Sequence, residues 1–299
     1  MKSIVTGSSG FIGNRLCLLL EEQGHEVIKV SRKIKSDSKK DLVCDLETSS
    51  LENKNLSDVR TIFHLAGYAH DLSNPENSKD KYYSLNVEAT LNLATQASEN
   101  GVEKFVYISS VKAESPSVSS GKVEDKDLGI YGETKRKAEL LLLELSQKTD
   151  MQIHIIRPSL VYGPDVKGNL LSMKVAIEKG WFPPIPRINN FKSMIHVDDL
   201  ARAIVFVAKE GIDKEIYNVT DGVDYSTTEI YETLCRLVEK KPPSFRIPLF
   251  AFELLAKVPS GLGHKVKKLL ENERFSSSKI RSLGYYSKLK LKQFNETLF

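Results

Sequence analysis

A tyrosine and a lysine, Tyr131 and Lys135, stand four residues apart at the start of the stretch IYGETKRKAELLLLEL. Residues at this spacing share one face of a helix, so the lysine ammonium can approach the phenol. A free tyrosine titrates near pH ~10 and a nearby cation favours the phenolate, so we expect Lys135 to lower the pKa of Tyr131. The pair could then transfer a proton at neutral pH, and two solvated helix residues are the alternative.

A third polar group would complete such a site by binding a substrate oxygen. Ser110 ends the β-branched run KFVYISS, at the carboxyl edge where parallel sheets bind ligands. A tyrosine as acid or base, a serine as hydrogen-bond partner and a nicotinamide as hydride carrier together predict the interconversion of an alcohol and a ketone.

The elements that must position these residues alternate between strands and helices. Short β-branched runs predict strands at 2–6, 25–30, 41–46, 60–66, 104–110 and 152–158, and helical patterns are clearest at 11–23, 79–100 and 132–148. Such alternation gives right-handed crossovers onto a parallel sheet that is covered on both faces. The sequence therefore predicts an α/β fold with a doubly wound parallel sheet of the Rossmann type.

The pattern loosens after Pro158, where helices are predicted from Asn169 and at 198–210, followed by one more strand, EIYNV, and further helices. We expect a dinucleotide-binding domain at 1–165, to which 192–222 returns. A smaller, mostly helical substrate domain is expected at 166–191 and 223–299.

Three glycines, Gly7, Gly10 and Gly13, follow the first predicted strand in TGSSGFIGNRL. Such glycines allow a tight turn, a close approach of the backbone to a pyrophosphate and close packing of the next helix, whose N-terminal N–H groups face the phosphates. The position between a strand and a helix predicts dinucleotide binding, and a plain glycine turn is the alternative.

The choice of cofactor depends on the end of the second predicted strand, where an NAD site usually has an acidic residue. This chain has Ser31, Arg32 and Lys33 there. A guanidinium beside a small hydroxyl suits a 2′-phosphate, so NADP (NADPH) is preferred and NAD remains possible. A solvated basic loop is the alternative.

Two further segments could contact the cofactor. Asp45, in the run DLVCDL, could meet the adenine edge or serve as a turn residue, and Ala66 and Gly67 have small side chains that would let the cofactor lie near the backbone.

Composition excludes several classes of function. A formal net charge of +4 is too small and dispersed to indicate nucleic-acid binding, and the three cysteines, Cys17, Cys44 and Cys235, lack metal spacing and fit a reducing cytoplasm. No metal site is expected. No apolar run predicts a membrane span or a signal peptide. The segment IPLFAFELLAKV at 247–258 could lie on a membrane surface, but a packed helix is favoured.

At this point the chain resembles the extended short-chain dehydrogenases/reductases, and within them the NAD(P)-dependent epimerase/dehydratase group that acts on nucleotide sugars. The motifs TGSSGFIG, HLAG, SLNVEAT, ISSV, YGETK, RPSLVYGP and MIHVDDLARAI occur in the order typical of that family. The resemblance implies a catalytic triad of Ser110, Tyr131 and Lys135, with Asn86 assisting proton transfer. It also implies that the RPSLVYGP segment lies against the nicotinamide.

The full set of expected contacts follows from the motifs and the resemblance together. The expected cofactor-binding residues are Gly7, Ser9, Gly10, Phe11, Ile12, Gly13, Ser31, Arg32, Asp45, Leu46, Leu65, Ala66, Gly67, Tyr131, Lys135, Pro158, Ser159 and Leu160. The expected substrate-binding residues are Ser110, Tyr162, Asn169 and Lys192. Lys192 occupies a position where UDP-sugar 4-epimerases commonly have a phosphate-binding arginine, and a solvated surface lysine is the alternative.

The resemblance leaves two main reactions. Nucleotide-sugar 4,6-dehydratases place Asp and Glu where this chain has Val111 and Lys112, so dehydration is not expected. Arg32 favours a 4-ketoreductase of a UDP-4-keto-6-deoxy sugar in polysaccharide precursor synthesis, and a UDP-sugar 4-epimerase is the alternative. A non-catalytic NADP-binding sensor is a remote third. A homodimer through helices 79–100 and 131–148 is also expected, as in many relatives.

Overall fold

The computed structural model describes residues 1–33, 41–69, 79–114 and 128–293. The chain divides into two compact units. The first unit consists of Met1–Pro158, Leu200–Val219 and Ser278–Tyr285, and the second consists of Ser159–Asp199, Thr220–Ser277 and Tyr286–Phe299. The functional domain bounds expected from the sequence remain a prediction.

The first unit contains a seven-stranded sheet in the order β3-β2-β1-β4-β5-β6-β9, with every neighbouring pair parallel. The strands are β1 (Lys2–Thr6), β2 (Glu26–Ser31), β3 (Leu42–Val43), β4 (Thr61–His64), β5 (Lys104–Ile108), β6 (Gln152–Pro158) and β9 (Ile216–Val219). Their apolar runs are buried because helices cover both faces of the sheet. The predicted α/β fold with a doubly wound parallel sheet is confirmed.

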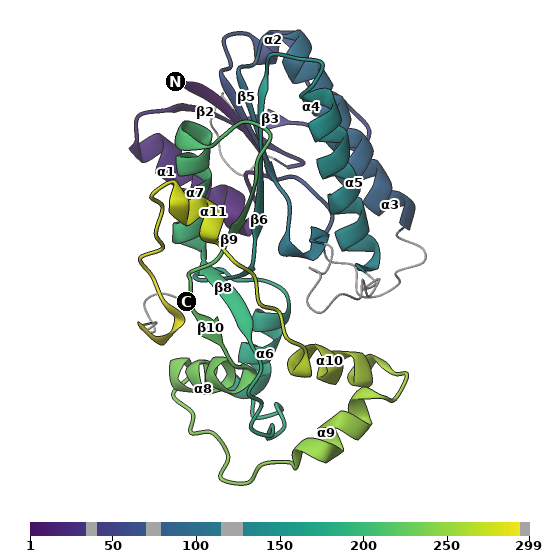
Figure 1. Ribbon diagram of the computed structural model, residues 1–299, viewed down its shortest axis with the longest axis vertical. Helices are drawn as coiled ribbons and strands as arrows, with labels where there is room; N and C mark the ends of the chain where they lie inside the picture. The colour runs from purple at the N-terminus through teal and green to yellow at the C-terminus, as the bar shows by residue number, and fades with distance from the viewer. Residues whose placement is uncertain (34–40, 70–78, 115–127, 294–299) are drawn as a thin grey trace. The chain divides into compact units, whose positions relative to one another are not determined.

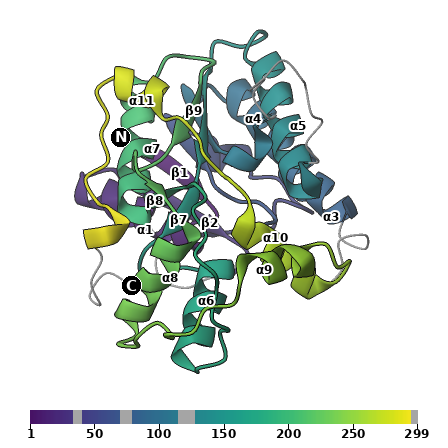
Figure 2. The same ribbon diagram turned by 60° about the horizontal axis from the view of Figure 1, so that its bottom comes forward.

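Figures 1 and 2 show helices α1 and α7 on one face of this sheet and α4 and α5 on the other. The helices associated with this unit are α1 (Phe11–Glu22), α2 (Asn53–Leu56), α3 (Lys79–Tyr83), α4 (Ala89–Glu99), α5 (Gly129–Leu145), α7 (Val197–Glu210), α11 (Ser278–Ser282) and the 3-10 turn η2 (Val111–Ala113). Leu93 of α4, Leu142 of α5 and Ile62 of β4 belong to one buried hydrophobic cluster.

The helix predicted at 79–100 is not a continuous α-helix. A π-helical turn, η1 (Ser84–Glu88), separates α3 from α4, and Asn86 lies in the middle of this turn. π-Turns inside helices occur frequently at functional sites because the extra residue changes the direction of a side chain.

The second unit contains a three-stranded sheet in the order β10-β8-β7 that the sequence did not predict. β7 (Leu160–Tyr162) runs parallel to β8 (Lys192–His196), and β10 (Asp224–Tyr225) pairs antiparallel with β8. Around it are α6 (Asn169–Glu178), α8 (Thr227–Leu237), α9 (Leu249–Ala256), α10 (Gly261–Leu270) and the 3-10 turn η3 (Leu291–Gln293). Among the described residues, no helix is both long and apolar enough to cross a membrane.

Candidate active site

The glycine-rich turn between β1 and α1 has the shape that a dinucleotide requires. Gly7 has φ +67°, and a Cβ atom there would lie 2.8 Å from the Ala66 nitrogen. A Cβ atom on Gly13 would lie 2.2 Å from the Gly7 carbonyl oxygen, so only glycine lets α1 approach the turn this closely.

Helix α1 begins without a side-chain cap. Gly10 is its N-cap residue and makes no side-chain hydrogen bond to the first turn. The N–H groups at this end, including those of Phe11 and Ile12, lack a capping side chain and can therefore receive an anion. The turn and the helix end can accommodate a pyrophosphate, and the contacts of Ser9, Phe11 and Ile12 with it remain a prediction.

The end of β2 lies against this turn. Ser8 donates hydrogen bonds from its N–H and its hydroxyl to the Val30 carbonyl, at 3.3 and 3.1 Å. Ser31 ends β2, and its hydroxyl donates to the Lys33 carbonyl at 2.6 Å. Arg32 is exposed directly after the strand, two residues from the carbonyl that binds Ser8. This position suits a residue that contacts the adenosine ribose.

Asp45 lies beside the same strand end but has a local role. The Cys44 N–H donates to the Ser31 carbonyl at 3.1 Å, which holds this segment against β2. The Asp45 carboxylate accepts from the Glu47 N–H at 3.2 Å, and the Asp45 carbonyl accepts from Ser49 N–H at 2.8 Å. The structure therefore gives Asp45 the turn role, whereas an adenine contact by Asp45 or Leu46 remains a prediction.

Ser110 and Tyr131 lie together at the carboxyl end of β5. Ser110 caps η2, and its Oγ atom accepts a hydrogen bond from the Lys112 N–H at 3.2 Å. The hydroxyls of Ser110 and Tyr131 are hydrogen-bonded to each other. The two groups expected to bind one substrate oxygen are thus adjacent.

Gly132 makes this arrangement possible and was not recognised from the sequence. A Cβ atom at this position would lie 2.4 Å from the Lys112 carbonyl oxygen. Helix α5 can therefore approach η2 only because residue 132 has no side chain. The YG pair in the motif was visible, but its meaning depends on the packing of η2 against α5.

The protonation state of Tyr131 differs from the expectation. Burial raises the pKa of Tyr131 to about 12, although the hydrogen bond from Ser110 opposes the shift. The prediction that Lys135 lowers this pKa is wrong for this structure. The reason is that the Lys135 ammonium donates to the Ile108 carbonyl at 2.9 Å and lies 4.7 Å from the centre of the Tyr107 ring.

Lys135 is itself perturbed, because only 3% of the residue is exposed. Burial lowers its pKa to about 8, and the Glu139 carboxylate, one turn further along α5, partly offsets this. A methyl group on Gly67 would lie 3.3 Å from the Lys135 Nζ atom and 3.0 Å from the Asn86 Oδ1 atom. The backbone at Gly67 therefore passes directly beside the ammonium and the amide.

Asn86 is fully buried and holds the segment after β4. Its Oδ1 atom accepts from the Tyr68 N–H at 2.7 Å, and its Nδ2 atom donates to the Tyr68 carbonyl at 3.0 Å and to Thr134 Oγ1 at 3.2 Å. Asn86 thus connects the π-turn to α5. These bonds position the neighbouring backbone, and a direct part in proton transfer remains a prediction.

A buried ion pair lies beneath the site and was also missed. Arg157 of β6 donates to both carboxylate oxygens of Glu139, at 2.8 and 2.6 Å, and Ser109 donates to the same carboxylate at 2.5 Å. The side chain of Arg157 is 7% exposed and that of Glu139 is 1% exposed. This network ties α5 to β5 and β6 next to Ser110 and Lys135.

The other cofactor residues of the first unit lie at strand ends. Leu65 and Ala66 follow β4, and their N–H groups donate to Thr6 Oγ1 at 3.2 Å each. Pro158 ends β6. All of these residues lie at the carboxyl edge of the sheet, which is where this fold binds dinucleotides.

The remaining predicted residues belong to the second unit. Ser159 is buried, and its hydroxyl has no hydrogen-bond partner in the part of the chain that the structure describes. Leu160 is 39% exposed on β7, and Asn169 is exposed at the first position of α6. An unpartnered buried hydroxyl is suited to a ligand, so Ser159 remains a good candidate for cofactor contact.

Tyr162 has a packing role in the structure. It is fully buried, its ring lies edge-on to His196 at 5.3 Å, and its hydroxyl donates to the Asp221 carboxylate at 3.4 Å. Burial raises the pKa of Asp221, whose carboxylate also accepts from Tyr225 at 2.7 Å. Substrate contact by Tyr162 remains a prediction.

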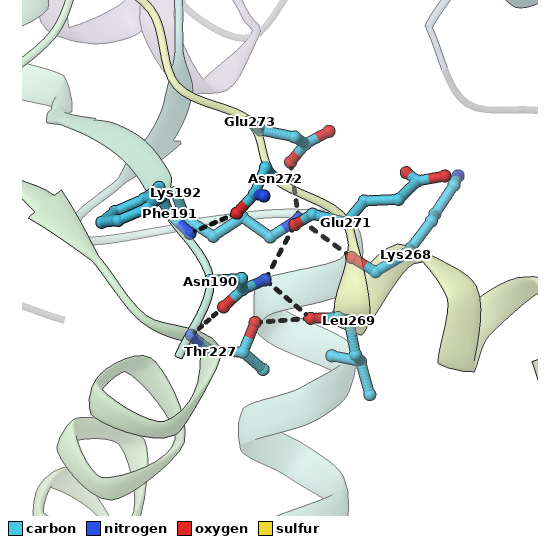
Figure 3. A network of polar contacts seen from close by, with 9 residues as sticks. All are labelled: Asn190, Phe191, Lys192, Thr227, Lys268, Leu269, Glu271, Asn272 and Glu273. Carbon is cyan, nitrogen blue, oxygen red and sulfur yellow. Dashed lines mark hydrogen bonds and ion pairs between the residues drawn. The ribbon is translucent and has the colours of Figure 1, made fainter. Parts of the chain in front are cut away.

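Lys192 is not the solvated residue offered as an alternative, because it is only 6% exposed. Its ammonium donates to the Lys268 carbonyl at 2.9 Å and pairs with the Glu273 carboxylate at 3.0 Å (Figure 3). The structure therefore gives Lys192 a role in holding the segment after α10. Its role as a phosphate ligand remains a prediction.

Comparison with known proteins identifies the family. The model of the NAD dependent epimerase/dehydratase family matches residues 3–220. The chain belongs to this family. It is 30% identical over 266 residues to a UDP-glucose 4-epimerase of Vibrio cholerae, and the match covers 85% of this chain and 81% of the relative.

Two further proteins extend the similarity over nearly the whole chain. An N-acetyl-α-D-glucosaminyl-diphospho-ditrans,octacis-undecaprenol 4-epimerase of Escherichia coli O157:H7 is 26% identical, over 97% of this chain and 92% of the relative. The structure of MoeE5 in complex with UDP-glucose and NAD has a similar fold, with a TM-score of 0.77, 22% identity and coverage of 98% and 95% of the two chains. The expected family is confirmed, and so is the prediction of an NAD(P)-dependent enzyme.

Proposed function

We propose that this protein is a nucleotide-sugar 4-epimerase, which inverts the configuration at C4 through a 4-keto intermediate. The observation that carries the proposal is the hydrogen-bonded pair of Ser110 and Tyr131 at the carboxyl edge of the sheet, beside the buried Lys135. These groups can hold and protonate a sugar oxygen. The naming of two family relatives as 4-epimerases supports the choice of epimerisation over the reduction favoured from the sequence.

Tyr131 transfers the proton in this proposal. Its high pKa keeps the phenol protonated at neutral pH, so it can donate to the oxygen of the 4-keto sugar while Ser110 hydrogen-bonds the same oxygen. The opposite step requires the phenolate. A positive charge on Lys135, one turn away, favours the phenolate once its ammonium turns towards the phenol.

The described residues fit a nicotinamide dinucleotide. The turn at Gly7 would receive the pyrophosphate, Arg32 would lie near the adenosine ribose, and Lys135, beside the backbone of Gly67, would bind the second ribose. When bound, this cofactor would accept a hydride from C4 of the sugar and return it to the same carbon. An epimerase also requires the sugar ring to present either face of C4 to the same group.

A 4-ketoreductase is the second candidate, and one observation favours it. The exposed residue directly after β2 is Arg32 rather than an acid, which suits the 2′-phosphate of NADPH. A reductase consumes one reduced cofactor in every cycle, whereas an epimerase returns its cofactor to the oxidised form and consumes none. Cofactor stoichiometry therefore separates the two reactions.

The proposed substrate class is a sugar attached through a diphosphate. One relative is named for UDP-glucose and the other for an amino sugar carried on a polyprenyl diphosphate. The two named substrates share the sugar diphosphate and differ in the group beyond it. We propose a UDP-sugar as the first substrate to test, with the polyprenyl-linked sugar second.

We also propose a cytoplasmic homodimer. The three cysteines are free, which fits a reducing compartment. Leu140 of α5 is 51% exposed on a helix expected to contact a second copy.

The experiment is incubation of the purified protein with UDP-glucose and, separately, UDP-N-acetylglucosamine, without added cofactor. Formation of the galacto epimer at substoichiometric cofactor is the expected result. If neither sugar is converted but a UDP-4-keto-6-deoxy sugar consumes NADPH in equal amount, the ketoreductase replaces the epimerase.

A further inference from the structure

One segment of the second unit concentrates positive charge. Between residues 240 and 270 there are seven Lys and Arg residues and a single acidic residue, Glu253, whereas the rest of the chain has two more acidic than basic residues. Arg246 is paired with Glu232, and Glu239 and Glu271 flank the segment. Lys257, Lys265, Lys267 and Lys268 are exposed on or near two helices, α9 and α10.

The same segment exposes large apolar side chains. Phe245 is 69% exposed, Phe250 64%, Leu254 60% and Leu262 57%, and Leu249 and Val258 are 43% and 47% exposed. The sequence favoured a packed helix for 247–258. The structure packs α9 on one side only, since Phe252 is buried while Phe250 and Leu254 are not.

The two helices form one firm support for these side chains. Phe252 of α9 and Val266 of α10 are both 4% exposed, and a Cβ atom on Gly263 would lie 2.1 Å from the Val258 carbonyl oxygen, so the helices are tightly joined. At the end of α10, Asn190 donates to the carbonyls of Leu269 and Glu271, at 2.9 and 2.8 Å (Figure 3). The exposed apolar residues therefore lie on an anchored pair of helices.

Helical spacing places apolar and basic residues on the same exposed sides. Phe250, Leu254 and Lys257 follow one another at intervals of four and three residues, and Lys265 follows Leu262 by three. Glu253 is the one acid on this side of α9 and lies four residues before Lys257. Apolar side chains beside lysines are typical of helices that lie in a membrane interface.

We propose that α9, α10 and the residues that precede α9 form a binding surface for an anionic phospholipid membrane, on which the protein lies without crossing it. Lysines attract the negative headgroups, and Phe250, Leu254 and Leu262 can enter the acyl boundary. A second copy of the chain fits poorly, because the same lysines would face one another. The proposal does not depend on the reaction, since lipid binding requires no sugar substrate.

The test is sedimentation of the full-length protein with vesicles of phosphatidylcholine alone or with 30% phosphatidylglycerol, a composition chosen at roughly the anionic content needed for polybasic binding. The bound fraction at fixed lipid should be at least about tenfold higher on the anionic vesicles, and should fall as salt is raised. Phe250→Ser/Leu254→Ser and Lys265→Glu/Lys267→Glu should each reduce binding about tenfold or more.

A matched control makes an apolar-to-serine and a lysine-to-glutamate substitution at exposed positions outside α9 and α10. Ile212 is 59% exposed and the Lys209 side chain is 81% exposed, so Ile212→Ser/Lys209→Glu should leave vesicle binding unchanged. Far-ultraviolet circular dichroism confirms that each variant is folded, and the comparison of the two vesicle types with the unchanged protein needs no variant.

Three results would overturn the proposal. The first is equal or absent binding of the unchanged protein to both vesicle types. The second is binding that is insensitive to Phe250→Ser/Leu254→Ser, which would leave only nonspecific charge attraction. The third is a dimer of the unchanged protein that these two substitutions convert to a monomer, which would assign the surface to a second copy.

Discussion

Lys135 carries a charge in a buried site, so its replacement should change how stability depends on pH. Burial lowers the pKa of its ammonium from 10.5 to about 8. The unfolded chain therefore binds this proton more tightly than the folded protein, and the free energy of unfolding rises with pH between about 8 and 10.5. From these two pKa values, the buried charge costs roughly 3 kcal/mol at pH 7 and about 1.3 kcal/mol less at pH 9.

The perturbation is Lys135→Met, which keeps an unbranched side chain, one atom shorter, and removes the charge. The variant also loses the hydrogen bond to the Ile108 carbonyl. This loss lowers its free energy of unfolding by an amount that is nearly the same at every pH. The assay is urea unfolding at pH 7, 8 and 9 on protein freed of nucleotide. From pH 7 to pH 9, the unfolding free energy of the unchanged protein should rise by about 1.3 kcal/mol more than that of the variant.

Lys137→Met is the control, because Lys137 is exposed on the same helix. Its unfolding free energy should follow that of the unchanged protein at every pH. A difference between the unchanged protein and Lys135→Met that stays constant from pH 7 to pH 9 would refute the reasoning, because it would show that burial does not perturb the Lys135 ammonium.

Three other predictions concern the site. Tyr131→Phe should lower turnover by roughly 10² to 10⁴ and leave nucleotide binding, measured by calorimetry, nearly intact; full activity would remove Tyr131 from the chemistry. Gly132→Ala should lower kcat by roughly tenfold or more, because a Cβ atom would lie 2.4 Å from a backbone oxygen, whereas Gly261→Ala, in open space, should not. Arg32→Ala should weaken NADPH by roughly 1.5 to 3 kcal/mol and spare NADH, and equal losses would contradict a 2′-phosphate contact.

The fold was predictable where the pattern was local and strong. Each strand of the parallel sheet contains a short β-branched or apolar run, which is why β1, β4, β5 and β6 were found. The small sheet of the second unit was missed because β7 and β10 have only three and two residues. Such strands form through long-range pairing with β8, and no local periodicity marks them.

The arrangement of the site was partly predictable. The sequence predicted that Ser110 and Tyr131 lie close together, because Ser110 follows the end of a predicted strand and Tyr131 stands at the start of a predicted helix. The pKa of Tyr131 was not predictable, since it depends on burial and on where the Lys135 ammonium points. The same holds for Glu139 and Arg157, which form an ion pair only after α5 packs on β6.

The places of Lys192 and Tyr162 in the motif order suggested substrate contact, yet their side chains are buried in the second unit. A lysine in KSMIH or a tyrosine in VYGP gives no local sign of burial. The partners that bury them, Glu273 and Asp221, lie many residues away in the chain. Burial of this kind is a tertiary property that spacing cannot reveal.

The central claim is that C4 of a nucleotide sugar is oxidised and reduced again within one site. Incubation of UDP-glucose carrying deuterium at C4 tests it most directly, with the product examined by mass spectrometry and NMR. The account predicts a mixture of the two C4 epimers that keeps the deuterium at C4, because the same hydrogen leaves and returns. Epimerised product that has exchanged its C4 deuterium for hydrogen from water would contradict it.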